Sequence, residues 1–178
     1  GYKPTFGTIN CAGMKHLSES LDTIGVLART VEDCALAVHA LSGRALPDFS
    51  AAARAPRLAL CRTSRRDKAS PETLALLERT AELLAREGAR VIERDLPPDF
   101  DRLYDEQRII SDFDMARGLL PEWCENPAAL SDHMRAQVEK HLDMPRARYA
   151  EAMQHAIECR ARFSSWLAEN DCEALLTP

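Results

Sequence analysis

Apolar side chains recur at helical spacing in the stretch that follows Thr30. They fall on one face of a helix and are Val31, Cys34, Ala35, Val38 and Leu41. The Thr30 hydroxyl is placed to cap a free backbone amide, and Asp33, three residues on, is placed to return the bond. Gly43 supplies a left-handed stop. The pattern predicts a helix that begins at Thr30, stops at Gly43 and turns one face toward a core.

Two short apolar runs flank a second helical stretch. The runs, residues 57–61 and 89–93, are bounded by charged residues and are typical of strands. Between them, Ser70 is a helix cap, Pro71 stands at the first helical position and Gly88 follows the helix end. A strand, a helix and a strand at this distance predict a right-handed crossover unit with two parallel strands.

The chain outside these elements shows weaker patterns before residue 57. Residues 1–29 are rich in Gly, Pro, Thr and Ser, which predicts loops and short strands rather than a helix. Within them, residues 22–28 predict a short and largely buried strand. Residues 46–57, with two prolines and a run of alanines, predict an exposed connection.

From Phe100 onward the pattern is helical for most of the remaining chain. Three prolines break it into several helices, and the last helix is predicted from about Arg146 to Glu169. The apolar run within residues 173–178 predicts a core strand. The predicted fold class is therefore α/β, with mixed sheet strands flanked by helices and a helical segment in the C-terminal half.

The length limits the domain organisation. A chain of 178 residues is long enough for one globular domain and too short for two full domains. We expect one partial domain made of four segments. They are the motif-bearing residues 1–47, the strand–helix–strand unit of residues 48–99, the mainly helical residues 100–172 and the core strand of residues 173–178.

The composition excludes several classes of protein. Acidic residues outnumber basic ones by 28 to 23, and the net charge of -5 argues against a nucleic-acid binder. No run approaches the roughly 18 consecutive apolar residues of a membrane span, and the first residues lack the charged-then-apolar pattern of a secretory leader. We therefore expect a cytoplasmic protein with a small-molecule substrate and with no nucleic-acid or membrane partner.

Cysteine and histidine spacing indicates no metal site. Six cysteines are scattered without a Cys-x-x-Cys pair, which favours reduced, buried thiols over a metal cage or a disulfide framework. The five histidines show no ligand spacing either; His133 and His141 share a face of one predicted helix but lie two turns apart. We expect neither a metal nor a cofactor.

Three motifs in the first 43 residues occur in an order that resembles the amidase signature family. The family's Gly-x-Lys-Pro-Thr segment, its Ser-Leu-Asp-x-x-Gly segment and its Ala-Arg-Thr-Val-x-Asp segment all have counterparts here. The matching residues are Gly1, Lys3, Pro4, Thr5, Gly7, Ser20, Leu21, Asp22, Gly25, Ala28, Arg29 and Thr30. Residues 173–178 also resemble the family's Asp-x-Leu-Leu-Thr-Pro strand, while residues 48–144 match in pattern only.

The resemblance implies the family's chemistry, which is hydrolysis of carboxylic amides by a serine nucleophile, a second serine held by a cis peptide bond, and a lysine. In the family these residues lie upstream of the Gly-x-Lys-Pro-Thr segment, and the serines sit in a Gly- and Ser-rich loop. This sequence has seven glycines and no such loop. We therefore expect an interior piece of an amide hydrolase, inactive alone, whose catalytic residues precede Gly1.

Three residues of the opening segment could imitate the catalytic set. They are Lys3, Ser18 and Ser20, and they belong to the wrong motifs for that role. Loop hydrogen bonding or capping is therefore the favoured interpretation of the two serines, and a structural role is favoured for the lysine.

Two charged residues stand in an otherwise apolar run. Buried charges need partners, so we expect Asp22 and Arg29 to pair with each other or with backbone amides of the catalytic loop. We hypothesise that Asp22 supports the active site from behind the groups that contact the substrate, and Arg29 is a candidate for the same role. The alternative is that Asp22 is a surface charge at a strand end.

Two further groups of residues suit a binding role less well. Four basic residues follow the first strand of the crossover unit, a position where α/β sheets bind phosphate. Their loop has no glycine whose backbone amides could close on a phosphate, so a solvated charged loop is favoured. The four residues are Arg62, Arg65, Arg66 and Lys68. Tyr149, Arg160 and Arg162 lie on or near the final helix, where aromatic packing with arginines in solvent is favoured over substrate contact.

The leading hypothesis is therefore part of an amidase signature hydrolase that acts on a small carboxamide. A close alternative is the glutamine-hydrolysing A-type component of a tRNA-dependent amidotransferase, which shares these motifs and works inside a complex. A noncatalytic α/β association module is an alternative from another class. Nucleotide binding by the crossover unit is disfavoured, because residues 62–66 contain no glycine. The oligomeric state, including a homo-oligomer, stays open.

Overall fold

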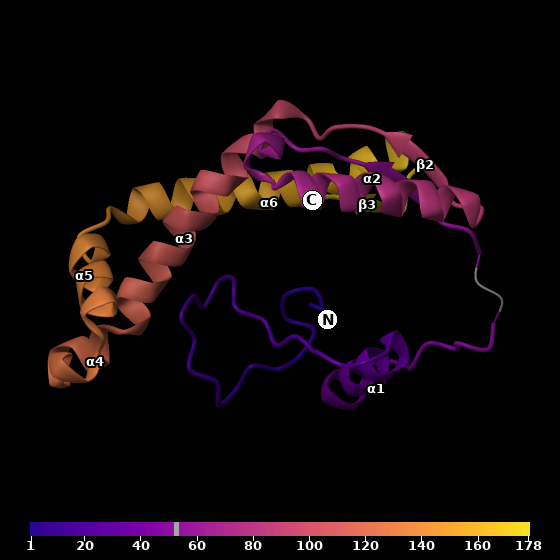
Figure 1. The fold of residues 1–178 in the computed structure, drawn as a ribbon. Coiled ribbons are helices and arrows are strands. Elements are labelled where there is room, and N and C mark those ends of the chain that lie inside the picture. The colour runs from indigo at the N-terminus through magenta and orange to yellow at the C-terminus, as the bar shows by residue number, and fades with distance from the viewer. Residues whose placement is uncertain (52–53) are drawn as a thin grey trace. The chain divides into compact units, whose positions relative to one another are not determined.

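The computed structural model describes residues 1–51 and 54–178, which contain both helices and strands (Figure 1). The α/β class predicted from the sequence is confirmed. In chain order, the helices and strands of the described residues are α1 (Val31–Ser42), β1 (Arg57–Leu60), α2 (Pro71–Arg86), β2 (Arg90–Glu93), α3 (Leu103–Gly118), α4 (Leu120–Glu125), α5 (Asp132–His141), α6 (Arg146–Glu169) and β3 (Ala174–Leu176).

The chain divides into two compact units, each made of two stretches of sequence. The first unit comprises Gly1–Ala52 and Gln107–Ala150, and the second comprises Ala53–Glu106 and Glu151–Pro178. Helices α3 and α6 each contribute residues to both units.

The second unit is built on a parallel sheet of three strands in the order β2-β1-β3. Leu58 on the central strand is opposite Val91 and Ala174, and the register continues through Ala59 and Leu60. The first two strands and α2 between them form the predicted crossover unit, and the predicted terminal strand is the third strand.

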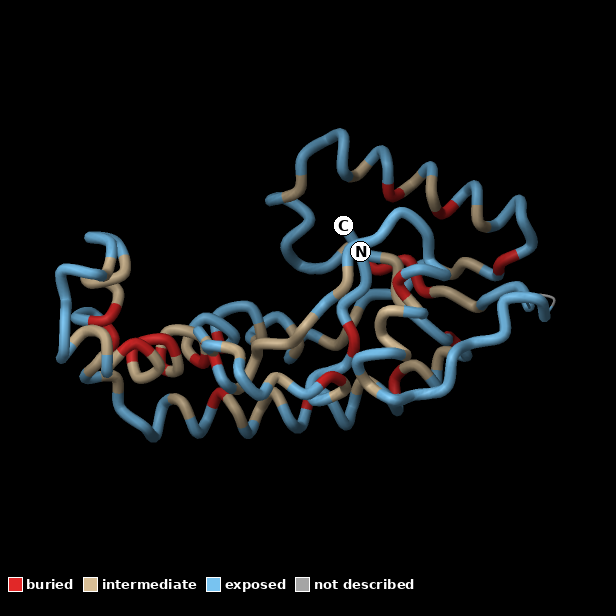
Figure 2. Tube along the Cα trace, turned by 90° about the horizontal axis from the view of Figure 1, so that it is seen from below, coloured by how far each residue is buried: buried red, intermediate tan, exposed pale blue. Residues whose placement is uncertain are grey.

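Both faces of this sheet are covered, because successive side chains of a strand point to opposite sides. On one face, Ala59 packs against Trp166 of α6 and Cys172. On the other face, Leu60 packs against Leu77 and Ala81 of α2. Figure 2 shows buried residues along the strands and on the inward side of α2. Burial on both faces explains why the strand sequences are continuously apolar rather than alternating.

The first unit has a helical core of its own. Met115 of α3 and Leu119, which lies between α3 and α4, pack with Val138 of α5, which is fully buried. Trp123, Leu130 and Met134 pack around this cluster. The helices predicted beyond Phe100 are therefore present, and α6 has the bounds that the apolar spacing predicted.

Helix ends follow the predicted signals. The Thr30 hydroxyl accepts a hydrogen bond from the Asp33 amide at 3.1 Å, and Gly43 is left-handed with φ 69°. Ser70 caps α2 by accepting from the Thr73 amide. The return bond expected from the Asp33 side chain does not form among the described residues.

The strand predicted for residues 22–28 is wrong. This part of the chain pairs only at Val26, in a single antiparallel bridge with Tyr2, and is otherwise irregular. Its apolar residues therefore have no ladder of neighbouring strands to join. The exposed connection predicted for residues 46–57 is present at 46–51 and 54–56, while Ala52 and Ala53 lie outside the described residues.

Replacing Leu77 by alanine is expected to destabilise the second unit by about 2 to 5 kcal/mol, the usual cost of removing a leucine side chain from a core. Leu77 is 5% exposed, whereas its neighbour Leu76 is 57% exposed. Urea unfolding followed by circular dichroism measures the change, and Leu76→Ala is the matched control with an expected change within about 0.5 kcal/mol. Equal losses in the two variants would show that α2 does not pack through Leu77.

Acid is expected to destabilise the start of the central strand through Glu173. The Arg57 backbone amide donates a hydrogen bond to the Glu173 carboxylate at 2.9 Å. This bond lowers the pKa of the Glu173 carboxyl below its usual range, and the nearby guanidiniums of Arg54 and Arg57 lower it further. Because the pKa of Glu173 is lower in the folded protein than in the unfolded chain, the ionised carboxyl stabilises the fold. This stabilisation is complete when the pH is above the pKa of the unfolded chain, about 4.3, and is lost as the pH falls through the pKa of the folded protein.

Melting temperatures between pH 6 and pH 3 test this linkage. The wild-type protein should lose more stability across that interval than Glu173→Gln, whose side chain does not titrate. Glu87→Gln, an exposed change in the same unit, should behave like the wild type. The same acid sensitivity in all three proteins would refute the assignment.

Candidate functional site

A short turn in the opening segment gathers most of the polar contacts of the predicted motifs. One carboxylate oxygen of Asp22 accepts hydrogen bonds from the backbone amides of Leu17 at 2.7 Å and Ser18 at 3.0 Å. The Asp22 amide in turn donates to the Ser18 carbonyl at 2.8 Å. Asp22 therefore closes the turn by binding backbone that lies within this chain.

A second carboxylate, Asp114 on α3, holds the same turn from outside. One Asp114 oxygen accepts from the Ser18 hydroxyl at 2.9 Å and from the Ser20 amide at 3.0 Å. Ser18 is only 4% exposed, so this bond satisfies a buried hydroxyl. Sequence reasoning missed Asp114, which lies more than ninety positions from the motif it serves. The available signal was a carboxylate among the buried residues Ile110 and Phe113 of one helix.

Helix α6 contributes a third contact to the turn. The Tyr149 hydroxyl lies 2.7 Å from the Ser20 hydroxyl, and either atom can be the donor. The Tyr149 ring stacks on Phe113 of α3 with 4.2 Å between ring centroids. The structure thus brings Ser20, a residue of the predicted motif, to Tyr149, which sequence reasoning placed in aromatic packing.

The first motif pairs with the end of the second. The Tyr2 amide donates to the Val26 carbonyl at 2.7 Å, and the Val26 amide donates back at 2.8 Å. Gly25 lies so close to this bridge that a Cβ there would be 3.2 Å from the Tyr2 carbonyl oxygen. The close approach of the two backbones therefore favours a residue without a side chain at this position of Ser-Leu-Asp-x-x-Gly.

The remaining residues of the first motif shape the chain and do not meet the turn. Pro4 is fully buried, and the Lys3 ammonium donates a hydrogen bond to the Pro4 carbonyl at 3.2 Å. The Thr5 carbonyl accepts from the Thr8 amide, and Gly7 has φ 77°, which favours glycine. Among the described residues, no hydrogen bond joins Lys3 to Ser18 or Ser20.

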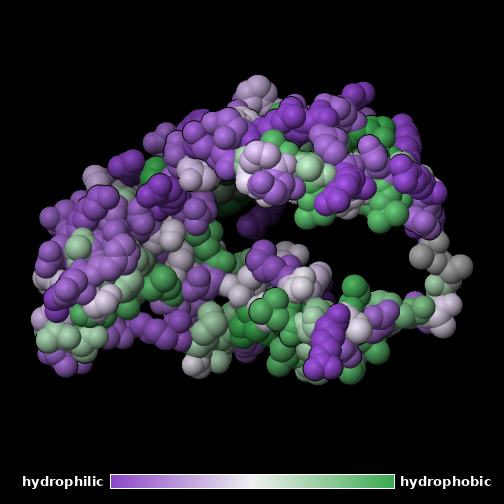
Figure 3. All heavy atoms as spheres, in the orientation of Figure 1, coloured by the Kyte–Doolittle hydropathy of each residue, from purple (hydrophilic) through white to green (hydrophobic). Residues whose placement is uncertain are grey.

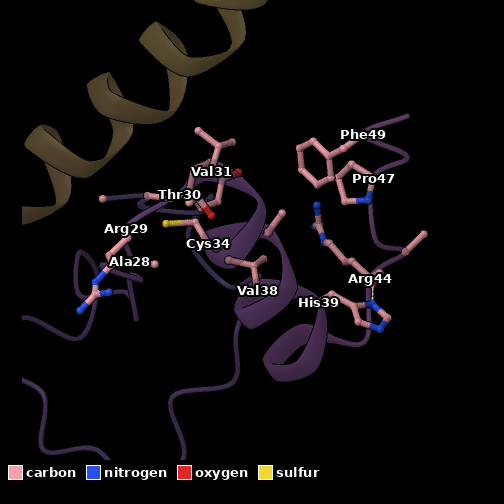
Figure 4. Close-up of a pocket in the computed structure, with 14 residues that line it drawn as sticks. Ala28, Arg29, Thr30, Val31, Cys34, Val38, His39, Arg44, Pro47 and Phe49 are labelled. Atoms are coloured by element: carbon pink, nitrogen blue, oxygen red, sulfur yellow. Dashed lines mark hydrogen bonds between the residues drawn. The ribbon is translucent and has the colours of Figure 1, made fainter. Parts of the chain in front are cut away.

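Arg29 lies apart from Asp22, and the expected pairing between the two does not occur among the described residues. Arg29 is exposed. It lines one end of a groove of about 500 Å³, with Pro47 and Phe49 toward the other end (Figure 4). Ala28 and Thr30 line the same groove.

The surface around this groove is strongly apolar. Leu27 is 91% exposed and Val31 is 72% exposed. Leu36 and Leu41 of α1 are also more than half exposed, and hydrophobic residues gather over this part of the chain in Figure 3. Cys34 is the only buried residue of α1, so the helix has far more apolar surface than the first unit covers.

A smaller hollow of about 430 Å³ opens beside the turn. Asp22 and His16 line it together with Thr8, and residues of α1 close one side. The His16 Nδ1 atom lies 3.9 Å from the Asp22 carboxylate, too far for a hydrogen bond. This nitrogen and the Thr8 hydroxyl are buried without a hydrogen-bond partner in the described chain.

The second unit contains a polar cluster of a different character. The Glu106 carboxylate binds the His155 imidazole, whose other nitrogen lies 3.4 Å from the Cys159 sulfur. This order of groups is found around activated thiols, but Cys159 is 1% exposed and burial raises the pKa of its thiol. The cluster therefore keeps a protonated thiol in the interior and does not prepare a nucleophile.

The other basic residues singled out from the sequence lie at the surface of the second unit. Arg62 binds Glu78 at 3.0 Å and also pairs with Glu93, while Arg65, Arg66 and Lys68 are exposed. Arg162 binds Asp99 at 2.7 Å. The Arg162 side chain lowers the pKa of Asp99 by donating this bond, and Arg160 is exposed.

Within residues 1–51 and 54–178, no group of three histidine, cysteine or acidic side chains is placed to hold a metal ion. None of the helices in this part of the chain is both long enough and apolar enough to cross a membrane.

Comparison with known proteins gives a consistent result. The family model described as Amidase matches residues 1–178. The A-type component of glutamyl-tRNA(Gln) amidotransferase from Rhodospirillum rubrum is 35% identical over 111 residues, covering 54% of this chain and 22% of that protein. The protein of the same name from Neisseria meningitidis serogroup C is 32% identical, covering 54% and 23%. The chain thus spans about a fifth of the length of these curated relatives.

Solved structures share the fold. One described as a crystal structure of amidase superimposes with a TM-score of 0.86 over 98% of this chain and 39% of that chain, at 23% identity. Another, described in terms of a vestigial protein complex and an s-triazine catabolic enzyme, gives 0.79 over 98% and 40%, also at 23% identity. At this level of identity the likeness concerns the fold alone.

Removing the Asp22 carboxylate is expected to loosen the turn. Asp22→Ala leaves the Leu17 and Ser18 amides without their acceptor, which should lower the free energy of unfolding of the first unit by about 1 to 2 kcal/mol. Hydrogen exchange of these two amides, followed by NMR, should accelerate roughly tenfold, since 1.4 kcal/mol corresponds to a factor of ten. Glu19→Ala, an exposed change inside the same turn, is the control. Equal exchange in both variants would contradict this role of Asp22.

Proposed function

This chain belongs to the amidase family, and from that premise we propose that it is the scaffold portion of an enzyme that hydrolyses the C–N bond of small carboxylic amides. The observation that carries the proposal is the match of the Amidase model across residues 1–178. The matches cover 22% and 23% of these relatives, which are longer than this chain, so the activity proposed is that of a polypeptide of their length.

Amide hydrolysis needs an activated nucleophile, donors for the developing oxyanion and an acid for the leaving amine. The contacts of the two serines in the turn argue against a nucleophilic role for either. The Ser18 hydroxyl is bonded to Asp114 and the Ser20 hydroxyl to Tyr149. We therefore assign the nucleophile and its lysine, as the family resemblance implies, to polypeptide outside these 178 residues.

In this proposal, the catalytic loop packs against the turn closed by Asp22 and against the Tyr2–Val26 bridge that follows this turn. The Asp22 carboxylate fixes the backbone at Leu17 and Ser18. Thr8 and His16 line the hollow beside Asp22, and each has one buried polar atom without a hydrogen-bond partner in the described chain. A catalytic loop rich in Gly and Ser would present backbone amides and hydroxyls, which are the groups that such atoms bind. Asp22 then affects catalysis by positioning the backbone against which the catalytic loop packs. Arg29 is exposed and does not pair with Asp22, so the same role is less well supported for it.

A second candidate is supported by the names of the curated relatives. At 32% to 35% identity, these relatives are named as the A-type component of glutamyl-tRNA(Gln) amidotransferase. A protein of that kind would take the side-chain amide of glutamine as its substrate and would work with partner proteins. Hydrolysis of glutamine that depends on an added partner, with no turnover of other amides, would favour this candidate.

We also propose a cytoplasmic location for the enzyme. All six cysteines are free thiols, and four of them are buried. Reduced thiols in this number fit a reducing compartment better than an oxidising one, where pairs tend to form disulfides.

Ammonia release from benzamide and from L-glutamine tests the proposed function. A polypeptide of amidase length that contains these residues should release ammonia from at least one of the two, whereas the 178-residue chain alone should release none. Ser18→Ala and Ser20→Ala in the short chain are controls, and both should remain inactive. Turnover by the short chain that disappears in either serine variant would overturn the scaffold assignment, and a long polypeptide that cleaves neither amide would argue against hydrolysis.

A further inference from the structure

We propose that Tyr149 is a positioning residue for amide hydrolysis, acting through Ser20 on the turn that carries Asp22 and never touching the substrate. The inference rests on the proposed function. It concerns a residue outside the motifs of the opening segment, more than one hundred positions away from the serine that it binds.

The first step of the inference is that Tyr149 is itself held rigidly. Its ring lies on Phe113 with an interplanar angle of 21° and 4.2 Å between centroids. An aromatic side chain has two rotatable torsions, and stacking on a buried ring restricts both. The hydroxyl at the end of the ring therefore has a fixed place, half-buried in the first unit.

The second step is that Phe113, the ring on which Tyr149 stacks, is also held in place. The guanidinium of Arg117 lies 3.4 Å above the Phe113 ring. The same side chain donates to the carbonyls of Leu142 and Met144, at 3.4 Å and 3.3 Å. These carbonyls lie just before α6 begins, so Arg117 fixes both the ring under Tyr149 and the start of the helix that carries it.

The third step is that Ser20 receives two independent restraints. Its amide donates to Asp114, and its hydroxyl binds Tyr149. The amide bond fixes the position of the backbone, and the hydroxyl bond fixes the rotation of the side chain. Since Asp22 is two residues on and is itself bonded to the Leu17 and Ser18 amides, a change at Ser20 is passed to the carboxylate.

The geometry points to positioning rather than to substrate binding. The two hydroxyls satisfy one another at 2.7 Å, and the Phe113 ring covers one face of Tyr149. A group that merely fixes another should affect the rate of the chemical step more than the affinity for substrate, because small displacements of reacting groups are costly. One neutral hydrogen bond can account for a loss of about five- to tenfold.

The test is a double-mutant cycle in the polypeptide of amidase length. Tyr149→Phe and Ser20→Ala should each lower kcat about five- to tenfold, with KM changed less than about twofold. The double variant should lose no more than either single variant, because both remove the same bond. Tyr104→Phe, which removes a hydroxyl from an exposed tyrosine of the second unit, is the matched control with wild-type kinetics.

A second readout does not depend on turnover. In the 178-residue chain, Tyr149→Phe should accelerate hydrogen exchange at the Ser20 and Ser18 amides. The melting temperature should stay within about 4 °C of the wild type, the shift that a loss of about 1 kcal/mol produces in a chain of this size. Exchange that is unchanged would overturn the inference. A larger fall in melting temperature that accounts for the lost activity would also overturn it, since the role would then be structural.

The kinetic outcomes separate this inference from the function on which it rests. If the wild-type long polypeptide cleaves no amide, the proposed function fails and the catalytic role of Tyr149 falls with it. If the wild type turns over and Tyr149→Phe has an unchanged kcat, or raises KM alone, or adds fully to Ser20→Ala, only the positioning role is refuted.

Discussion

Two carboxylates together accept the hydrogen bonds of one turn, and the packing of the opening segment in the first unit depends on these bonds. Asp22 accepts from the amides of Leu17 and Ser18, and Asp114 accepts from the Ser18 hydroxyl and the Ser20 amide. A polar turn with a buried serine is stable only if its donors find acceptors. Asp114 belongs to α3, so the same bonds that satisfy the turn also attach the irregular opening segment to the helices.

The second unit is held by a different force. Its parallel sheet is sandwiched between α2 and α6, and side chains from the central strand reach both layers, Ala59 toward Trp166 and Leu60 toward Leu77. Burial of apolar area is non-directional, so this unit tolerates variation in the identity of its core residues better than the turn tolerates loss of a carboxylate. The residues that resemble family motifs lie mainly in the first unit, where hydrogen-bond geometry is specific.

Local features of the structure could be predicted and long-range ones could not. Thr30, Ser70 and Gly43 mark helix ends through bonds to near neighbours, and these ends are where the sequence placed them. The strand expected at residues 22–28 failed because strand formation depends on partners that the local pattern does not reveal. The partner of Asp114 could not be predicted for the same reason, since nothing near this residue in sequence indicates which turn it binds.

The separation of Ser18 from Asp114 along the chain has a consequence during synthesis on the ribosome. The two residues are 96 positions apart. At roughly 5 to 20 residues per second, about 5 to 20 seconds pass between their translation. During that interval the nascent opening segment lacks the acceptor for its serine, while the strand–helix–strand part emerges completely. The crossover can therefore begin to form co-translationally before the segment that precedes it has anything to dock on.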